Sequence, residues 1–232
     1  EKHDFTDKLN VEELKLKNPT NVEKMNLWST IAHTLDLALE KDDSAVVFGE
    51  DVKFGGVFRC TMGLNENMEP IEFSTLPCLS KVSLASRSVL LALAQPPSLR
   101  CNSLIISSLL SIRSLMKPLS SDTDPVMSLS AESSQLDPLG AVGHGAHYHS
   151  QSPEAYFAHT PGLIVAMPRS PIQAKGMLLS CIRSNDPCIF FEPKILYRIA
   201  EEDVPLEDYE IPLGKAEVMQ EGSDITIVSY GM

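Results

Sequence analysis

Apolar positions in the second half of the chain predict a strand, a helix and another strand in close succession. Residues 163–167 are apolar and are followed by a turn with two prolines, in which Ser170 is suited to cap a helix. A helix is expected over 172–183, and the Asn-Asp-Pro sequence that follows ends it before an apolar strand over 188–191. These short connections are typical of a βαβ unit, so we expect an α/β fold with a parallel sheet flanked by helices.

The first half of the chain carries a shorter version of the same pattern. Apolar residues recur at helical spacing from Trp28 to Leu39, and a buried strand is expected over 45–48. Before them, residues 1–25 are polar and charged and predict a mobile N-terminal arm.

The last part of the chain indicates a boundary. An acidic connector over 201–210 precedes strand-like runs within 211–228, and the sequence stops just after the last run. We therefore expect an incomplete sequence with three parts. These are the arm over 1–25, one domain over 26–205, and a linker with the truncated start of a C-terminal domain over 206–232.

Composition changes sharply between residues 74 and 139. This window holds 17 Ser and 15 Leu but no glycine and no aromatic residue. A packed α/β domain needs glycines for turns and aromatic side chains for its core, so the window is typical of a Ser/Leu-rich low-complexity insertion. We expect it to be poorly ordered, as helix or disorder.

Charge and cysteine usage exclude several classes of protein. The chain has 232 residues and a formal charge of −12, which argues against general nucleic-acid binding and against a polybasic membrane surface. No stretch approaches the ~20 apolar residues of a membrane span. Five cysteines, an odd number without a C-x-x-C pair, favour buried thiols in a reducing compartment.

Three motifs, at 48–60, 143–155 and 190–198, resemble the β subunit of the branched-chain 2-oxo acid dehydrogenase decarboxylase component. Their sequences are Phe-Gly-Glu-Asp-Val-Lys-Phe-Gly-Gly-Val-Phe-Arg-Cys, Gly-His-Gly-Ala-His-Tyr-His-Ser-Gln-Ser-Pro-Glu-Ala and Phe-Phe-Glu-Pro-Lys-Ile-Leu-Tyr-Arg. The resemblance covers roughly 24–66 and 140–232, and it implies a transketolase-like, pyrimidine-binding domain.

The resemblance also implies an activity and partners. It implies a subunit of 3-methyl-2-oxobutanoate dehydrogenase (2-methylpropanoyl-transferring), which acts in branched-chain amino-acid catabolism. This enzyme decarboxylates branched-chain 2-oxo acids and passes the acyl group to lipoyl-lysine on an acyltransferase core. Thiamine diphosphate is shared with an α subunit in an α2β2 heterotetramer, and magnesium is held mainly by α. The expected location is the mitochondrial matrix in a eukaryote and the cytoplasm otherwise.

Two residues match the family's cofactor site. The resemblance makes Glu50 a cofactor-binding residue, and a carboxylate after a strand suits the ligand crevice of a parallel sheet. It makes His149 the catalytic residue, because imidazole changes its charge near neutral pH. His144 and His147 complete an H-x-x-H-x-H pattern, for which a zinc site and structural histidines are the alternatives.

Three residues align with a structural potassium site of the family. Cys181, Ser184 and Asp186 stand where the family binds potassium, largely through backbone carbonyls. The family usually has an acid and an amide where Ser184 and Asp186 stand, which argues against side-chain ligation. An ordinary helix end is the alternative.

The 74–139 window departs from the family, which has there a glutamate that activates the cofactor ring and a tyrosine that lines its site. We hypothesise that the window is family coding sequence in the wrong frame. Codons compatible with 101–113, read two bases later, spell Gln-Phe-Ala-Asp-Tyr-Ile-Phe-Pro-Ala-Phe-Asp-Gln, which is similar to the family's segment there. The alternative function is accordingly a non-catalytic, frameshifted variant that retains at most assembly contacts.

Overall fold

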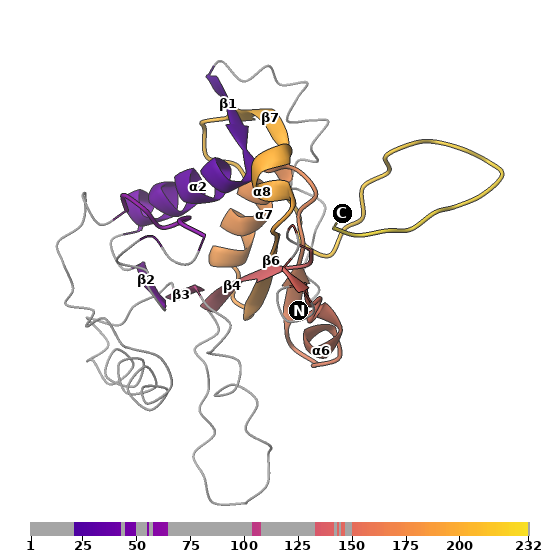
Figure 1. Ribbon diagram of the computed structural model, residues 1–232, viewed down its shortest axis with the longest axis horizontal. Coiled ribbons are helices and arrows are strands. Elements are labelled where there is room, and N and C mark those ends of the chain that lie inside the picture. Colours follow the sequence, from indigo (N-terminus) through magenta and orange to yellow (C-terminus); the bar gives the residue numbers. More distant parts are fainter. Residues whose placement is uncertain are drawn as a thin grey trace, which may run out of the picture.

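Five parallel strands form the central sheet of the structure, a computed structural model (Figure 1). Their spatial order is β2-β3-β4-β6-β5, and every neighbouring pair is parallel. The strands are β2 (Val46–Gly49), β3 (Leu104–Ser107), β4 (Ser133–Leu139), β5 (Ile164–Ala166) and β6 (Cys188–Pro193). The α/β fold with a parallel sheet is thus confirmed.

The structure describes residues 21–42, 45–49, 55, 58–64, 104–107, 133–141, 143, 145–146 and 150–231. Two stretches of the 74–139 window are among them, and both are strands of the sheet, β3 and β4. The structure differs here from the prediction of helix or disorder, because β4 pairs along its length with the buried strand β6. The remainder of the window lies outside the described residues.

Helices cover both faces of the sheet. They are α2 (Leu27–Lys41), α6 (Glu154–Ala158), α7 (Pro171–Ile182) and α8 (Leu196–Ile199). All six residues of β6 are buried, as in a central strand of a parallel sheet. Cys188 and Phe190 pack with α2 and α7, whereas Ile189 and Phe191 pack with Phe157 of α6. This alternation follows from the two-residue period of a strand.

The start of α7 corrects one detail of the prediction. Ser170 occupies the N-cap position and Pro171 begins the helix, as expected, but the Ser170 side chain makes no capping bond. Instead, the Ile172 amide donates to a Glu202 carboxylate oxygen at 3.1 Å. The acceptor therefore comes from a strand 30 residues away in the chain, β7 (Glu201–Pro205).

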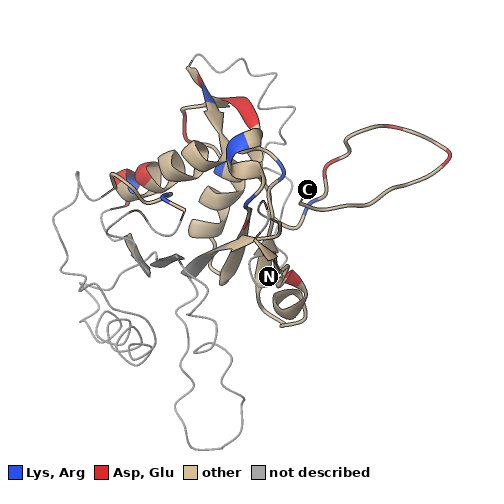
Figure 2. Cartoon of the chain, viewed as in Figure 1, with Lys and Arg blue, Asp and Glu red and all other residues tan. Residues whose placement is uncertain are grey.

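An antiparallel ribbon replaces part of the predicted arm and part of the predicted connector. β1 (Val22–Asn26) pairs with β7 from Val22 with Pro205 to Asn26 with Glu201. Acidic residues of β7 lie beside a lysine of β1 (Figure 2), and Lys24 forms an ion pair with Glu201 at 2.9 Å. Residues 1–20 of the predicted arm lie outside the described residues.

The C-terminal segment differs from prediction. Residues 211–228 contain no helix or strand, although their apolar runs predicted strands. This segment extends away from the sheet as an open loop (Figure 1), and Ile225, Ile227 and Val228 are exposed. A strand requires a neighbour for its backbone N–H and C=O groups, and the described residues supply none here.

Candidate functional site

The chain leaves β2 and β4 at the same edge of the sheet. Gly49, the last residue of β2, pairs with Ser107 of β3, which in turn pairs with Leu136 of β4. Only β3 separates the two strands, so their axes lie about 10 Å apart. Ligands of open parallel sheets bind at this carboxyl edge, so the sheet places the two motif-bearing segments where a ligand would bind between them.

The segment after β4 is closed by a hydrogen bond at its base. The Gly140 amide donates to the Gln151 carbonyl at 2.9 Å, and the Lys194 amide after β6 donates to the Leu139 carbonyl at 3.1 Å. Gly140 has a φ of 77°, a left-handed conformation that glycine adopts without strain. These bonds fix the two ends of the chain stretch whose sequence includes the predicted catalytic histidine.

The two predicted site residues, Glu50 and His149, follow strands of this sheet in the sequence. Glu50 follows the last residue of β2, and His149 follows β4 by ten residues. Both lie outside the described residues, as do His144 and His147. The structure thus brings together the backbone that flanks Glu50 and His149.

A tight turn over 58–64 packs beside this edge. The Trp28 indole N–H donates to the Phe58 carbonyl at 2.7 Å, and the Phe58 ring lies 5.5 Å from the Tyr197 ring. Arg59 has a φ of 66°, which is unusual for a residue other than glycine. Cys60 and Leu64 are buried in the main core, so the turn is held from several sides.

The sequence analysis missed a buried polar cluster beneath this turn. The Tyr197 hydroxyl donates to a carboxylate oxygen of Glu192, and both side chains are buried. Burial and the Glu192 carboxylate raise the pKa of Tyr197 well above its usual value, and burial raises the pKa of Cys60. A lone acid inside the apolar run Cys-Ile-Phe-Phe-Glu-Pro was the available signal, since a buried carboxylate needs a partner.

The residues predicted for potassium lie together at the end of α7. The Asp186 amide donates to the Ser184 hydroxyl at 3.1 Å, and the Ser184 amide donates to the Cys181 carbonyl at 3.1 Å. The Cys188 thiol lies 3.4 Å from the Asp186 carbonyl. Hydrogen bonds from Cys181 and Ser184 lower the pKa of Cys188.

The atoms available at Cys181, Ser184 and Asp186 limit which kind of ion could bind at the end of α7. Within the described ranges, no three or more His, Cys, Asp or Glu residues form a group arranged to hold a metal. The carbonyls of Cys181 and Asp186 lie in this turn as acceptors, from the Ser184 amide and the Cys188 thiol respectively. An oxygen-seeking monovalent ion bound by carbonyls fits this set better than zinc does.

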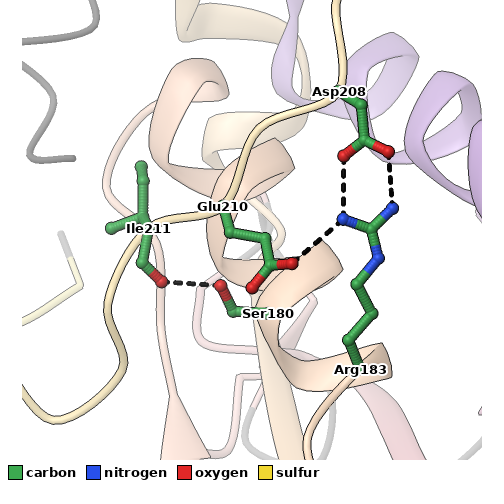
Figure 3. Close-up of polar contacts among 5 residues, drawn as sticks. All are labelled: Ser180, Arg183, Asp208, Glu210 and Ile211. Carbon is green, nitrogen blue, oxygen red and sulfur yellow. Dashed lines mark hydrogen bonds and ion pairs between the residues drawn. The ribbon is translucent and has the colours of Figure 1, made fainter. Parts of the chain in front are cut away.

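The end of α7 is clamped by the chain that follows β7 (Figure 3). Arg183 forms paired hydrogen bonds with Asp208 at 2.8 and 2.6 Å and a third with Glu210 at 3.1 Å. The buried Ser180 hydroxyl donates to the Ile211 carbonyl at 2.7 Å. The polar corner at Cys181 to Asp186 therefore lies beside a fixed helix end.

Comparison with known proteins agrees with this architecture. The family model described as "Transketolase, pyrimidine binding domain" matches residues 127–200, which include β4 through α8. The 2-oxoisovalerate dehydrogenase subunit beta, mitochondrial, of Dictyostelium discoideum is 46% identical over 229 residues, covering 96% of this chain and 60% of that protein. The chain is similar in sequence to the β subunits of branched-chain 2-oxo acid dehydrogenases. Within it, residues 127–200 match the transketolase pyrimidine-binding domain.

Other relatives extend the comparison to a neighbouring group. Subunit beta 2 of the mitochondrial 2-oxoisovalerate dehydrogenase of Arabidopsis thaliana is 45% identical over 89% of this chain and 58% of that protein. The pyruvate dehydrogenase E1 component subunit beta of Acholeplasma laidlawii is 34% identical over 89% of this chain and 64% of that protein. The higher identities to the 2-oxoisovalerate proteins agree with the predicted branched-chain type.

The chain spans about 60% of the length of the first of these relatives. The alignment covers 96% of the chain, so it runs through most of the 74–139 window as well as the two flanking blocks. Across the ranges that the structure describes, no helix combines the length and apolar character needed to cross a lipid bilayer.

Proposed function

We propose that this chain is the β subunit of a branched-chain 2-oxo acid dehydrogenase decarboxylase component. With an α subunit in an α2β2 assembly, it decarboxylates branched-chain 2-oxo acids oxidatively and delivers the acyl group to lipoyl-lysine of an acyltransferase core. The observation that carries this proposal is the similarity to 2-oxoisovalerate dehydrogenase β subunits over nearly the whole chain. The parallel sheet supports it, because β2 and β4, which precede Glu50 and His149 in the sequence, end at the same carboxyl edge.

Thiamine diphosphate is the cofactor that we propose for this edge. When bound, it supplies the carbanion chemistry, while the protein binds and orients it. Glu50 binds the cofactor, and His149 holds or transfers a proton at the substrate's acyl or carboxylate group. The resemblance to the family supports magnesium held mainly by the α subunit.

Potassium is proposed at the corner formed by Cys181, Ser184 and Asp186. The hydrogen-bonded turn from Cys181 to Asp186, which gathers backbone carbonyls at the end of α7, supports this assignment, and the Ser184 hydroxyl accepts from the Asp186 amide. The ion would tie the end of α7 to the start of β6.

The cellular location and the domain boundaries are also proposed. The mitochondrial names of the eukaryotic relatives support a place in the mitochondrial matrix. Residues 26–205 form the pyrimidine-binding domain, preceded by an arm over 1–25, and 206–232 form a linker and the start of a C-terminal domain. The β1–β7 ribbon crosses the first of these boundaries, because Val22 to Met25 pair with residues before 206.

A second candidate is a non-catalytic variant that retains only assembly contacts. The composition of the 74–139 window favours it, because the window contains neither glycine nor aromatic residues. A frame shift there would remove the family's cofactor-activating glutamate.

Calorimetric titration with thiamine diphosphate in the presence of an α subunit separates the two functions. Saturable binding that weakens in Glu50→Gln, with turnover that falls in His149→Ala while binding persists, supports the enzyme. Absence of binding by this chain, together with activity after repair of the 74–139 frame, supports the non-catalytic variant. A transcript read that retains the window as written would establish that the unusual composition belongs to the molecule.

A further inference from the structure

The buried cluster of Glu192, Tyr197 and Cys60 joins three separate elements. Glu192 lies at the end of β6, Tyr197 lies on α8, and Cys60 belongs to the turn over 58–64. The Tyr197 hydroxyl donates to the Glu192 carboxylate, and Cys60 of the turn is buried in the same core cluster as Tyr197. Hydrogen bonds to a charged group are stronger than neutral ones, so this contact can hold a turn in place.

The same turn is held at a second point by Trp28 of α2. The indole N–H donates to the Phe58 carbonyl at 2.7 Å, and the Arg198 guanidinium lies 5.2 Å from the Trp28 ring. The Thr61 amide of the turn donates to the carbonyl of Gly55, which precedes the turn, at 3.1 Å. Gly55 is buried with a φ of 104°, a conformation that favours glycine, so this bond ties the turn to the chain just before it.

Glu50 precedes this turn by only a few residues in the sequence. Residues 50–54 separate the end of β2 from Gly55. Five residues span at most about 18 Å when fully extended. The position of the turn therefore restricts where the segment with Glu50 can lie, because β2 fixes its other end.

We propose that Glu192, Tyr197 and Cys60 form a latch that seats the turn over 58–64 and thereby positions the Glu50 segment for the cofactor. The latch rests on the proposed function, because its purpose is to order the thiamine diphosphate site in advance. Tyr197 and Glu192 are positioning residues, since they act through the turn. When only a fraction of the molecules has the site ordered, the apparent Kd equals the intrinsic Kd divided by that fraction.

Trp28 provides a direct readout of the latch. It is the only tryptophan of the chain, and its indole N–H is bonded to the turn itself. Release of the turn in Tyr197→Phe is expected to shift Trp28 emission to longer wavelength and to increase its quenching by acrylamide. These measurements use the chain without cofactor, with circular dichroism as a check on folding.

The functional readout is the apparent affinity for thiamine diphosphate after assembly with an α subunit. We expect Tyr197→Phe to raise the half-saturating concentration about tenfold while kcat at saturating cofactor is retained. Glu192→Gln keeps an acceptor for the Tyr197 hydroxyl and should show a smaller change in both readouts. Tyr209→Phe is the matched control, because Tyr209 is a buried tyrosine whose hydroxyl donates to the Ile172 carbonyl, away from the turn.

The outcomes separate the latch from the proposed function. Unchanged Trp28 emission in Tyr197→Phe overturns the latch, and so does a changed emission with unaltered cofactor affinity. Equal effects of Tyr197→Phe and Tyr209→Phe also overturn it, because they would reflect general loosening. If the unsubstituted assembly binds no thiamine diphosphate, the proposed function fails, and the positioning role fails with it even where Trp28 emission confirms the contact.

Discussion

The buried lysine of α7 provides the sharpest test of the electrostatics. Lys175 is fully buried, its ammonium donates to the Pro205 carbonyl at 2.6 Å, and it lies 5.2 Å from the centre of the Tyr209 ring. Burial lowers the pKa of Lys175 from 10.5 to about 8, and the through-space effects of Asp208 and Glu207 offset only part of this shift. Folding therefore requires a charge to be removed from water whenever Lys175 is protonated.

The sign and size of the effect follow from proton linkage. Between pH 8 and 10.5 the unfolded chain holds the lysine proton and the folded chain does not, so the free energy of unfolding rises with pH across this window. A shift from 10.5 to about 8 corresponds to about 3 kcal/mol of destabilisation below pH 8. Raising the pH from 7 to 9.5 recovers about 2 kcal/mol of it.

The assay compares urea unfolding of the chain and of Lys175→Met at a series of pH values. Methionine has a similar length and cannot titrate, so subtracting the variant's free energy of unfolding cancels the other ionisable groups. We expect the difference, chain minus variant, to increase by about 2 kcal/mol from pH 7 to 9.5. Lys24→Met is the control, because exposed Lys24 has its pKa raised by Glu201 and stays protonated over this range. A Lys175 difference that is constant with pH would refute the reasoning.

Two further substitutions test contacts of the same helix, and a third tests the opposite face of the sheet. Gly176→Ala would place a Cβ 2.6 Å from a carbon of Ile211, so we expect crowding of about 1–3 kcal/mol to exceed the ~1 kcal/mol of helix propensity gained. Urea titration should show a lower midpoint, with a smaller loss when Ile211 is also changed to Ala. Arg183→Gln should cost about 0.5–1 kcal/mol by urea titration, and less in molar salt, because its pair with Asp208 is partly exposed. Phe191→Ala should cost about 3–5 kcal/mol by thermal unfolding, since the ring is fully buried, and Phe191→Leu should cost much less.

Sequence pattern was sufficient for the elements that form through local contacts. The helical spacing from Trp28 to Leu39 became α2, and the strand, helix and strand expected from 163 to 191 became β5, α7 and β6. Each of these elements has its own apolar period, and that period depends only on residues a few positions apart. The βαβ reading also predicted the parallel pairing of β5 with β6.

The candidate site could be predicted only in part. The motifs named Glu50 and His149, and the parallel register brings the chain that flanks them to one edge of the sheet. The pairing of Glu192 with Tyr197 was not predicted, because nothing in the motif indicates that its acid and its phenol point at each other beneath the turn over 58–64. Their partnership depends on how α8 folds back onto β6.

The sequence by itself determined the α/β class, the βαβ unit and the motifs at the edge of the sheet. Tertiary structure decided which groups became partners. Glu202 took the capping role expected of Ser170, and β1 became a strand only because β7 lies beside it. Strand-like runs after residue 210 formed no strand, since the described chain gives them no neighbour. Apolar periodicity is a property of adjacent residues, whereas hydrogen bonds and buried charges depend on distant groups that only the folded chain brings together.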